Sequence, residues 1–235
     1  MKLNAKLILI PASLGSKSTS HILPMHNREM IKDISIFIVE NIRSARRFLR
    51  ASGFQKDFNE VTFHVLDKHT ELTELQSFLA KREEQTIGLL SEAGLPCIAD
   101  PGAQIVRMAH EKNMEVVPLV GPSSIMLSLM ASGFNGQNFV FHGYLPIQKK
   151  EREMKILEIE RSVYQHDQTQ IFIETPYRNM QMLESLQEKC RKDTHLCLAW
   201  NLTLPGQQII SQDIAAWQKM KIDIHKKPAV FLLYK

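Results

Sequence analysis

The chain has 235 residues, of which 44% are apolar and 23% charged, and its formal net charge is +4. These values are ordinary for a globular protein of one large or two small domains, and the mild positive charge permits a polyanionic partner without requiring one. No run approaches the roughly eighteen apolar residues of a membrane span, and the N-terminus lacks a signal-peptide pattern, so we expect a cytoplasmic protein with no membrane partner.

In the first half of the chain, short apolar runs alternate with amphipathic segments, as in a parallel α/β layer. The pattern predicts strands at 6–12, 34–39, 61–66, 86–90 and 115–120. Helices are predicted at 41–51, 70–81 and 103–112, and Thr70 is a plausible N-cap for the second of them.

The second half mixes short connections with helical ones, which indicates a partly antiparallel sheet. Strands are predicted at 139–143, 170–174, 195–201, 207–211 and 228–234. Helices are predicted at 123–132, 149–161, 176–190 and 212–220. We therefore expect two α/β domains, 1–120 with a mainly parallel sheet and 121–235 with a mixed sheet.

Two predicted strands end in glycine, proline and small hydroxyl residues, at 91–96 and at 121–124. Gly94 and Gly121 permit unusual backbone angles, while the prolines close to them fix φ and remove a hydrogen-bond donor. Sheets in which strands alternate with helices bind their ligands at the carboxyl ends of the strands, where backbone amides are exposed. The alternative is that both stretches are ordinary turns from strand to helix.

Charged side chains mark two predicted helices and one strand end. The basic ones are Arg43, Arg47 and Arg50 on one stripe of the first helix, and Lys149, Lys150 and Arg152 near the start of the second. They are either solvated surface or contacts for phosphate groups. Glu40 ends the second predicted strand, where it either caps the following helix or belongs to a reaction centre.

Several enzyme classes find no support in the motifs. The three cysteines lack a CxxC pattern, and the nine histidines form no HExxH, so neither a disulfide framework nor a zinc site is indicated. A Gly-x-Ser-x-Gly elbow and a Gly-x-Gly-x-x-Gly fingerprint are both missing. The segment around Gly15 is no phosphate loop, because Ser16 separates the glycine from Lys17.

Four ordered motifs carry a resemblance that covers nearly the whole chain. They are Glu-Asn-Ile-Arg at 40–43, Ser-Glu-Ala-Gly-Leu-Pro-Cys-Ile-Ala-Asp-Pro-Gly at 91–102, Val-Val-Pro-Leu-Val-Gly-Pro-Ser-Ser at 116–124 and Glu-Thr-Pro-Tyr-Arg at 174–178. The chain thereby resembles the tetrapyrrole methylase superfamily, and within it the branch that methylates a ribose 2′-hydroxyl of small-subunit ribosomal RNA. Three positions depart from that branch: Ser16 and Asn41 replace Asn and Asp, and Glu92 replaces Asp.

The resemblance implies an S-adenosylmethionine-dependent methyltransferase whose methyl donor lies in a cleft between the two domains. Because a ribose hydroxyl needs a proton acceptor, Glu40 is the catalytic candidate. The positions that match the donor site come from both halves of the chain. They are Pro11, Ser91, Glu92, Ala93, Gly94, Pro122, Ser123, Ser124, Ile173, Glu174, Thr175, Asn201, Leu202, Pro228 and Ala229.

The partners implied by the resemblance are ribosomal RNA and a second copy of the chain in a homodimer. The two basic stripes would then contact RNA phosphates. Two alternatives stay open, namely a methyltransferase of a tetrapyrrole or corrin-like small molecule, and a non-catalytic module that binds RNA or the donor.

Overall fold

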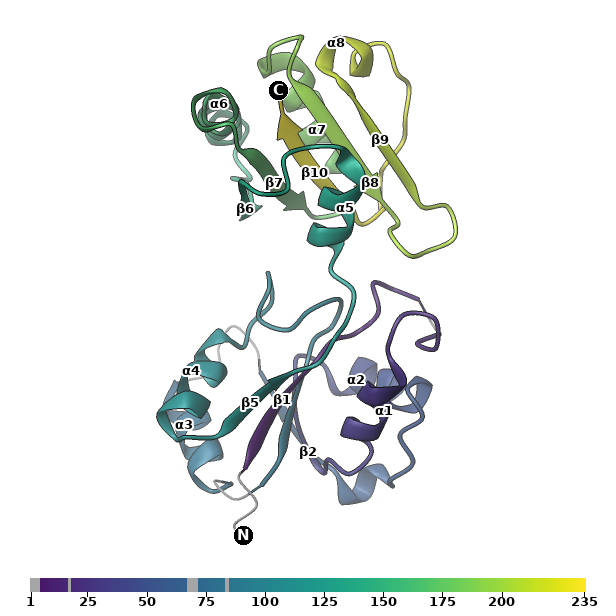
Figure 1. Ribbon diagram of the computed structural model, residues 1–235, viewed down its shortest axis with the longest axis vertical. Helices are drawn as coiled ribbons and strands as arrows, with labels where there is room; N and C mark the ends of the chain where they lie inside the picture. Colours follow the sequence, from purple (N-terminus) through teal and green to yellow (C-terminus); the bar gives the residue numbers. More distant parts are fainter. Residues whose placement is uncertain (1–4, 17, 67–71, 83–84) are drawn as a thin grey trace. The chain divides into compact units, whose positions relative to one another are not determined.

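The chain forms two compact units in a computed structural model that describes residues 5–16, 18–66, 72–82 and 85–235. The N-terminal unit extends to Ser123 and the C-terminal unit begins at Ser124. Each unit contains one five-stranded sheet with helices packed on it, as Figure 1 shows. The two units are described separately below.

All neighbouring strands of the first sheet run parallel, as the alternation of strand and helix predicts. Their order across the sheet is β3-β2-β4-β1-β5. The strands are β1 (Lys6–Ile10), β2 (Ile36–Val39), β3 (Thr62–Val65), β4 (Ile87–Leu90) and β5 (Glu115–Pro118). Because β1 lies between β4 and β5, the loops that follow these three strands lie next to one another at the carboxyl ends of the strands, which we call the carboxyl edge of the sheet.

Helices cover both faces of this sheet, and consecutive strand residues supply two separate cores. Leu7 packs with residues of α3 and α4 on one face, and Ile8 packs with residues of α1 and α2 on the other. The helical elements are α1 (Met25–Ile31), α2 (Ile42–Ala51), the 3-10 turn η1 (Phe58–Glu60), α3 (Leu72–Ala80) and α4 (Ala103–Glu111). The predicted cap Thr70 lies outside the described residues.

The second sheet is mixed, as the short connections predict. Strand β6 pairs parallel with β7, and the remaining pairs are antiparallel in the order β6-β7-β10-β8-β9. The strands are β6 (Phe139–Tyr144), β7 (Thr169–Glu174), β8 (His195–Trp200), β9 (Gln208–Asp213) and β10 (Ala229–Tyr234).

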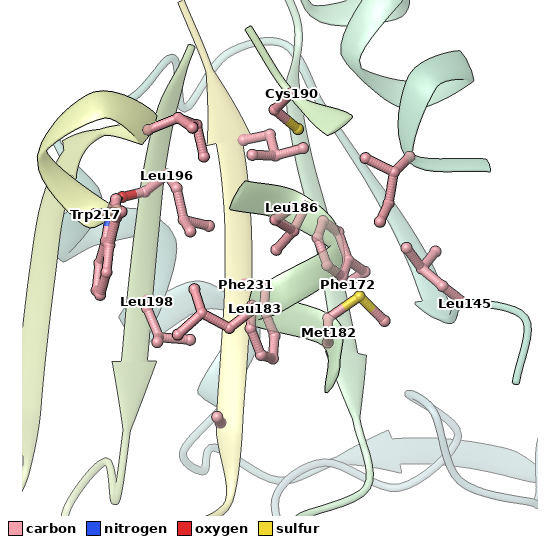
Figure 2. Packing of buried hydrophobic residues seen from close by; sticks show 14 of the residues in the cluster. Leu145, Phe172, Met182, Leu183, Leu186, Cys190, Leu196, Leu198, Trp217 and Phe231 are labelled. Carbon is pink, nitrogen blue, oxygen red and sulfur yellow. The ribbon is translucent and has the colours of Figure 1, made fainter. Parts of the chain in front are cut away.

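One face of the second sheet carries the larger core, part of which Figure 2 shows. There Phe172 and Phe231 stack with their ring centroids 5.5 Å apart, and the Trp217 indole donates a 2.8 Å hydrogen bond to the Leu196 carbonyl. Helix α5 packs on the other face, against β8, β9 and β10. The helices of this unit are α5 (Ser124–Ser132), α6 (Lys149–His166), α7 (Asn179–Lys189) and α8 (Ile214–Trp217). None of the helices in the described ranges is long and apolar enough to cross a bilayer.

Candidate functional site

The loops at the carboxyl edge of the first sheet bring several predicted site residues together. Pro11 follows β1, Ser91 follows β4 and Glu40 follows β2, and these three strands are consecutive neighbours in the sheet. Two hydrogen bonds join the first two loops, since Ala12 N donates to Gly94 O over 2.9 Å and Gly94 N donates to Ala12 O over 3.2 Å. The 91–94 loop thus lies directly beside the end of β1.

Both glycines singled out in the sequence have structural reasons to be glycine. Gly94 has φ +78°, which favours a residue without Cβ, and a Cβ there would lie 3.2 Å from a Leu14 methyl carbon. Gly121 is packed against the Pro11 ring so closely that a Cβ would lie 2.2 Å from the proline Cβ. The loop after β5 is fixed further by Asn27 of α1, whose amide donates to the Val120 carbonyl over 2.7 Å.

Three carboxylates interact at this edge. Burial raises the pKa of Glu40, and the negative charges of Asp100 and Glu92 raise it further. A hydrogen bond from the Glu92 backbone lowers this pKa in part. Burial also raises the pKa of Asp100, which accepts a hydrogen bond from the Ser91 hydroxyl. Glu92 in turn accepts a hydrogen bond from Ser44 of α2. The pKa values of Glu40 and Asp100 are thus both raised above their ordinary values, which makes each carboxylate a candidate for proton transfer.

The residue after Glu40, and not Glu40 itself, caps the helix that follows β2. Asn41 is the N-cap of α2, and its side-chain oxygen accepts hydrogen bonds from the backbone of Arg43 over 2.9 Å and Ser44 over 3.1 Å. Asn and Asp cap helices about equally well, so the change from the Asp of the related branch preserves the cap and removes a negative charge beside the three carboxylates. The Glu40 side chain is thus not the cap of this helix.

A pocket of 520 Å³ opens beside these carboxylates, within the N-terminal unit. One side of α2 and the residues 90–93 line it, together with Ala12, Ser13, Gly15, Ser16 and Thr19. Arg47 is the arginine of the predicted stripe that lines this pocket, and among the described residues it has neither a hydrogen-bond partner nor an ion-pair partner. It is exposed, so its guanidinium is available to a ligand.

The other arginines of the stripe differ from Arg47 in their contacts. Arg50 lies over the Phe58 ring, 4.1 Å from its centroid, and donates a 2.6 Å hydrogen bond to the Phe54 carbonyl. Arg43 is exposed at the first turn of α2. The stripe therefore divides into a structural residue at its far end and two accessible arginines nearer the carboxylates.

The second basic group contains one residue that does not fit a phosphate-binding role. Arg152 is only 4% exposed and donates to the Ser185 hydroxyl over 3.1 Å and to the Ile147 carbonyl over 2.8 Å, so the prediction that it contacts RNA is wrong. Lys149 makes ion pairs with acidic residues of α6 and α7. Lys150 is exposed.

In the C-terminal unit, the pairing of strands brings together, at one end of the sheet, the other residues that were predicted to bind the methyl donor. Ala229 pairs with Glu174 at the end of β7 and with Trp200 at the end of β8, and Asn201 N donates to the Pro228 carbonyl over 3.0 Å. Ile173 and Thr175 flank Glu174, and Leu202 follows Asn201.

Glu174 is the most constrained side chain at this second edge. Its residue is 4% exposed, and one carboxylate oxygen accepts hydrogen bonds from Thr175 N over 2.6 Å and from Arg178 Nε and Nη2 over 3.0 and 2.6 Å. The other oxygen, Oε2, is buried and has no partner among the described residues. An acceptor in this state is suited to a ligand that donates a hydrogen bond.

The Ala-Asp-Pro-Gly motif was visible in the sequence, but no role was predicted for Asp100, although this residue belongs to the carboxylate cluster.

The family Tetrapyrrole (Corrin/Porphyrin) Methylases matches residues 7–217. The chain belongs to this family. The loops at 91–94 and at 121–122 both lie within the matched region.

Curated relatives of this chain carry the name ribosomal RNA small subunit methyltransferase I. The one from Haemophilus influenzae is 29% identical over 79% of the chain and 63% of the relative. The one from Synechocystis is 31% identical over 77% of the chain and 62% of the relative, and the one from Escherichia coli O157:H7 is 28% identical over 91% and 72%. The chain thus spans less than two thirds of the length of the first two.

Solved structures of the same fold are methyltransferases by their titles. The methyltransferase CobJ matches with a TM-score of 0.62 and 16% identity over 99% of this chain and 94% of that one. Cobalt precorrin-4 methyltransferase, CbiF, matches with a TM-score of 0.60 and 14% identity over 97% and 94%. At these identities the likeness concerns the fold alone.

Proposed function

We propose that this protein is an S-adenosylmethionine-dependent methyltransferase that acts on a ribose 2′-hydroxyl of ribosomal RNA. The observation that carries the proposal is the carboxylate cluster of Glu40, Glu92 and Asp100 at the carboxyl edge of the first sheet, beside a pocket with a free arginine. The names of the curated relatives support RNA as the substrate. Such a substrate would place the protein in the cytoplasm.

In this mechanism Glu40 takes the proton of the ribose 2′-hydroxyl. Bound S-adenosylmethionine supplies a methyl group on a sulfonium centre, and the remaining work is to position the hydroxyl and to accept its proton. The pKa of Glu40 is raised by burial and by Asp100 and Glu92, so its carboxylate is a stronger base than an ordinary glutamate. Asp100 and Glu92 act on Glu40 through their charges.

The residues present fit the methyl donor. It carries hydroxyl and amino groups that need acceptors, and the buried Oε2 of Glu174 is an acceptor without a partner among the described residues. The 91–94 loop and the Gly121–Pro122 turn offer backbone where side chains are excluded by the close contacts at Gly94 and Gly121. We assign Ser91 to Gly94 and Pro122 to Ser124 to the donor, and the assignment of the second edge follows from the family resemblance.

The donor assignment is tested by Gly94→Val. The substitution forces a branched side chain into a left-handed backbone position, 3.2 Å from a Leu14 methyl carbon, and displaces the loop that should contact the donor. We expect titration calorimetry to show at least a tenfold weaker affinity for S-adenosylmethionine, with Gly136→Val as the control because nothing lies within 4 Å of a Cβ at Gly136. Equal affinities in the parent and Gly94→Val would refute the assignment.

RNA as the substrate is tested by the salt dependence of binding. Each neutralised phosphate contributes about 0.9 to the log–log slope for a duplex and about 0.7 for a single strand. Changing Arg43 and Arg47 together to Ala should therefore flatten the slope by roughly 1.4 to 1.8, and a control pair of exposed arginines, Arg107 and Arg161, should leave it nearly unchanged. Parallel slopes for the parent and the Arg43/Arg47 variant would favour a small-molecule substrate.

We also propose that the protein is a homodimer. Four large apolar side chains between residues 144 and 157 are exposed, namely Tyr144, Ile147, Met154 and Leu157. Exposed apolar side chains of this size are typical of surfaces that a stable partner covers. Analytical ultracentrifugation should show a dimer, and a monomer at every concentration would contradict this proposal.

A further inference from the structure

The pocket beside the carboxylates is built within the N-terminal unit and has a gradient of chemistry along it. Its volume of 520 Å³ falls in the range of small-molecule sites, roughly 300 to 1,000 Å³. Helix α2 forms one wall with Ser44, Arg47, Phe48 and Ala51, and the loop residue Glu92 lies opposite the start of this wall. The end of β4 and the loop after it contribute the residues from Leu90 to Ala93 to the lining.

The direction of α2 fixes which end of the pocket is acidic. Ser44 lies in the first turn of the helix and donates its hydroxyl to Glu92, whose charge acts on Glu40. With a helical rise of 1.5 Å per residue, Phe48 and Ala51 lie about 6 and 10 Å farther along the axis. One end of the pocket therefore presents hydroxyl and carboxylate groups. The other presents an aromatic ring and a methyl group, beside Thr19, whose hydroxyl donates to the Ala51 carbonyl over 2.9 Å.

Among the described residues that line the pocket, one is a cation, and it lies between these two ends. Arg47 comes between Ser44 and Phe48 in the helix, lines the pocket and has no acceptor among the described residues. The neighbouring Arg46 and Arg50 differ, because both guanidinium groups lie over the Phe58 ring, at 5.4 and 4.1 Å from its centroid. An unpartnered arginine at a pocket that is acidic at one end favours a ligand with one anionic group and with hydroxyl groups elsewhere.

We propose that this pocket holds one nucleotide of the RNA, taken out of its stack, with the ribose at the Ser44–Glu92 end. The base then lies along Phe48 and Ala51, and a phosphate of the same nucleotide meets Arg47. This inference rests on the proposed function and adds that the enzyme acts on an extruded or unpaired nucleotide. Aromatic contact with the base replaces part of the stacking energy lost on extrusion, and a ribose placed at the carboxylate end has its 2′-hydroxyl near Glu40.

The test uses the four ribonucleoside 5′-monophosphates as probes, titrated into the full chain by protein-detected NMR with S-adenosylhomocysteine present at saturation. We expect at least one monophosphate to bind, and Ala51→Phe to weaken that binding at least tenfold by filling the base end. We expect Arg47→Ala to weaken the monophosphate several-fold while the corresponding nucleoside binds as it does to the parent. Arg107→Ala, on the opposite face of the sheet, is the matched control and should bind like the parent.

Two results would overturn the pocket assignment. One is equal monophosphate affinity in the parent, Ala51→Phe and Arg47→Ala, each shown by its thermal transition to be folded. The other is monophosphate binding that is seen only in a titration without S-adenosylhomocysteine, which would make the pocket part of the donor site. The proposed function fails separately, through loss of donor binding and of RNA binding in the parent, so a parent that binds donor and RNA but no monophosphate refutes the pocket assignment alone.

Discussion

The contact between Gly121 and Pro11 predicts that adding a single methyl group at Gly121 will strongly destabilise the protein. In Gly121→Ala the new Cβ would lie 2.2 Å from Pro11 Cβ and 2.3 Å from its Cγ, whereas carbon atoms in contact are normally about 3.5 to 4.0 Å apart. The loop after β5 and the end of β1 would have to separate by about 1.3 Å or more. Neither side yields easily, because the proline ring is rigid and the Asn27–Val120 hydrogen bond holds the loop.

Overpacking costs typically about 1 to 3 kcal/mol, and with a rigid ring on one side we expect roughly 3 kcal/mol of unfolding free energy to be lost. For a chain of this size that corresponds to a fall of about 6 to 12 °C in the thermal midpoint. Differential scanning calorimetry measures it, with Gly136→Ala as the control because a Cβ there meets nothing within 4 Å. A midpoint for Gly121→Ala within about 1 °C of the control would show that the contact does not restrain the loop.

Three further predictions concern the carboxylates, the thiols and the second core. Glu40→Gln should lower the methylation rate by about 10²-fold to 10⁴-fold. Asp100→Asn should move the acid limb of the pH–rate profile to lower pH, because it removes a charge that raises the Glu40 pKa. An unchanged acid limb would contradict this. Burial raises the pKa of Cys197 to about 12 and also raises that of Cys190, so both thiols should react with Ellman's reagent only after denaturation. Trp217→Phe should cost about 1 to 3 kcal/mol in urea unfolding, because the carbonyl that Trp217 bonds loses its donor.

The sheets were predictable because their strands are short apolar runs bounded by glycine and proline. Each strand in the described ranges begins and ends within two residues of its predicted bounds. Helix α1 was missed because its signals are weak: Pro24 stands at its N-cap position, no side chain caps it, and it has only seven residues. Its place depends on contacts made after folding, such as the burial of Ile31 and the bond from Asn27 to Val120.

Spacing alone identified the arginine stripe but could not divide it. Arg47 and Arg50 are neighbours on one helix face, yet Arg50 is covered by Phe58 from a turn that follows later in the chain. Arg152 shows the same limit, because the hydroxyl that it bonds belongs to Ser185 on another helix. A charged residue becomes structural through partners distant in sequence, and periodicity within one helix carries no information about them.

The paired bonds between Ala12 and Gly94 make the loops after β1 and β4 a single cooperative unit. Opening either loop breaks both bonds, because each residue is at once the donor and the acceptor of the other. Their two amides should therefore exchange with solvent deuterium at a common opening free energy, even though the residues stand far apart in the chain. A molecule that stabilises the 91–94 loop will therefore also slow amide exchange at Ala12. Exchange at Ala12 can thus detect binding to that loop without a measurement on the loop itself.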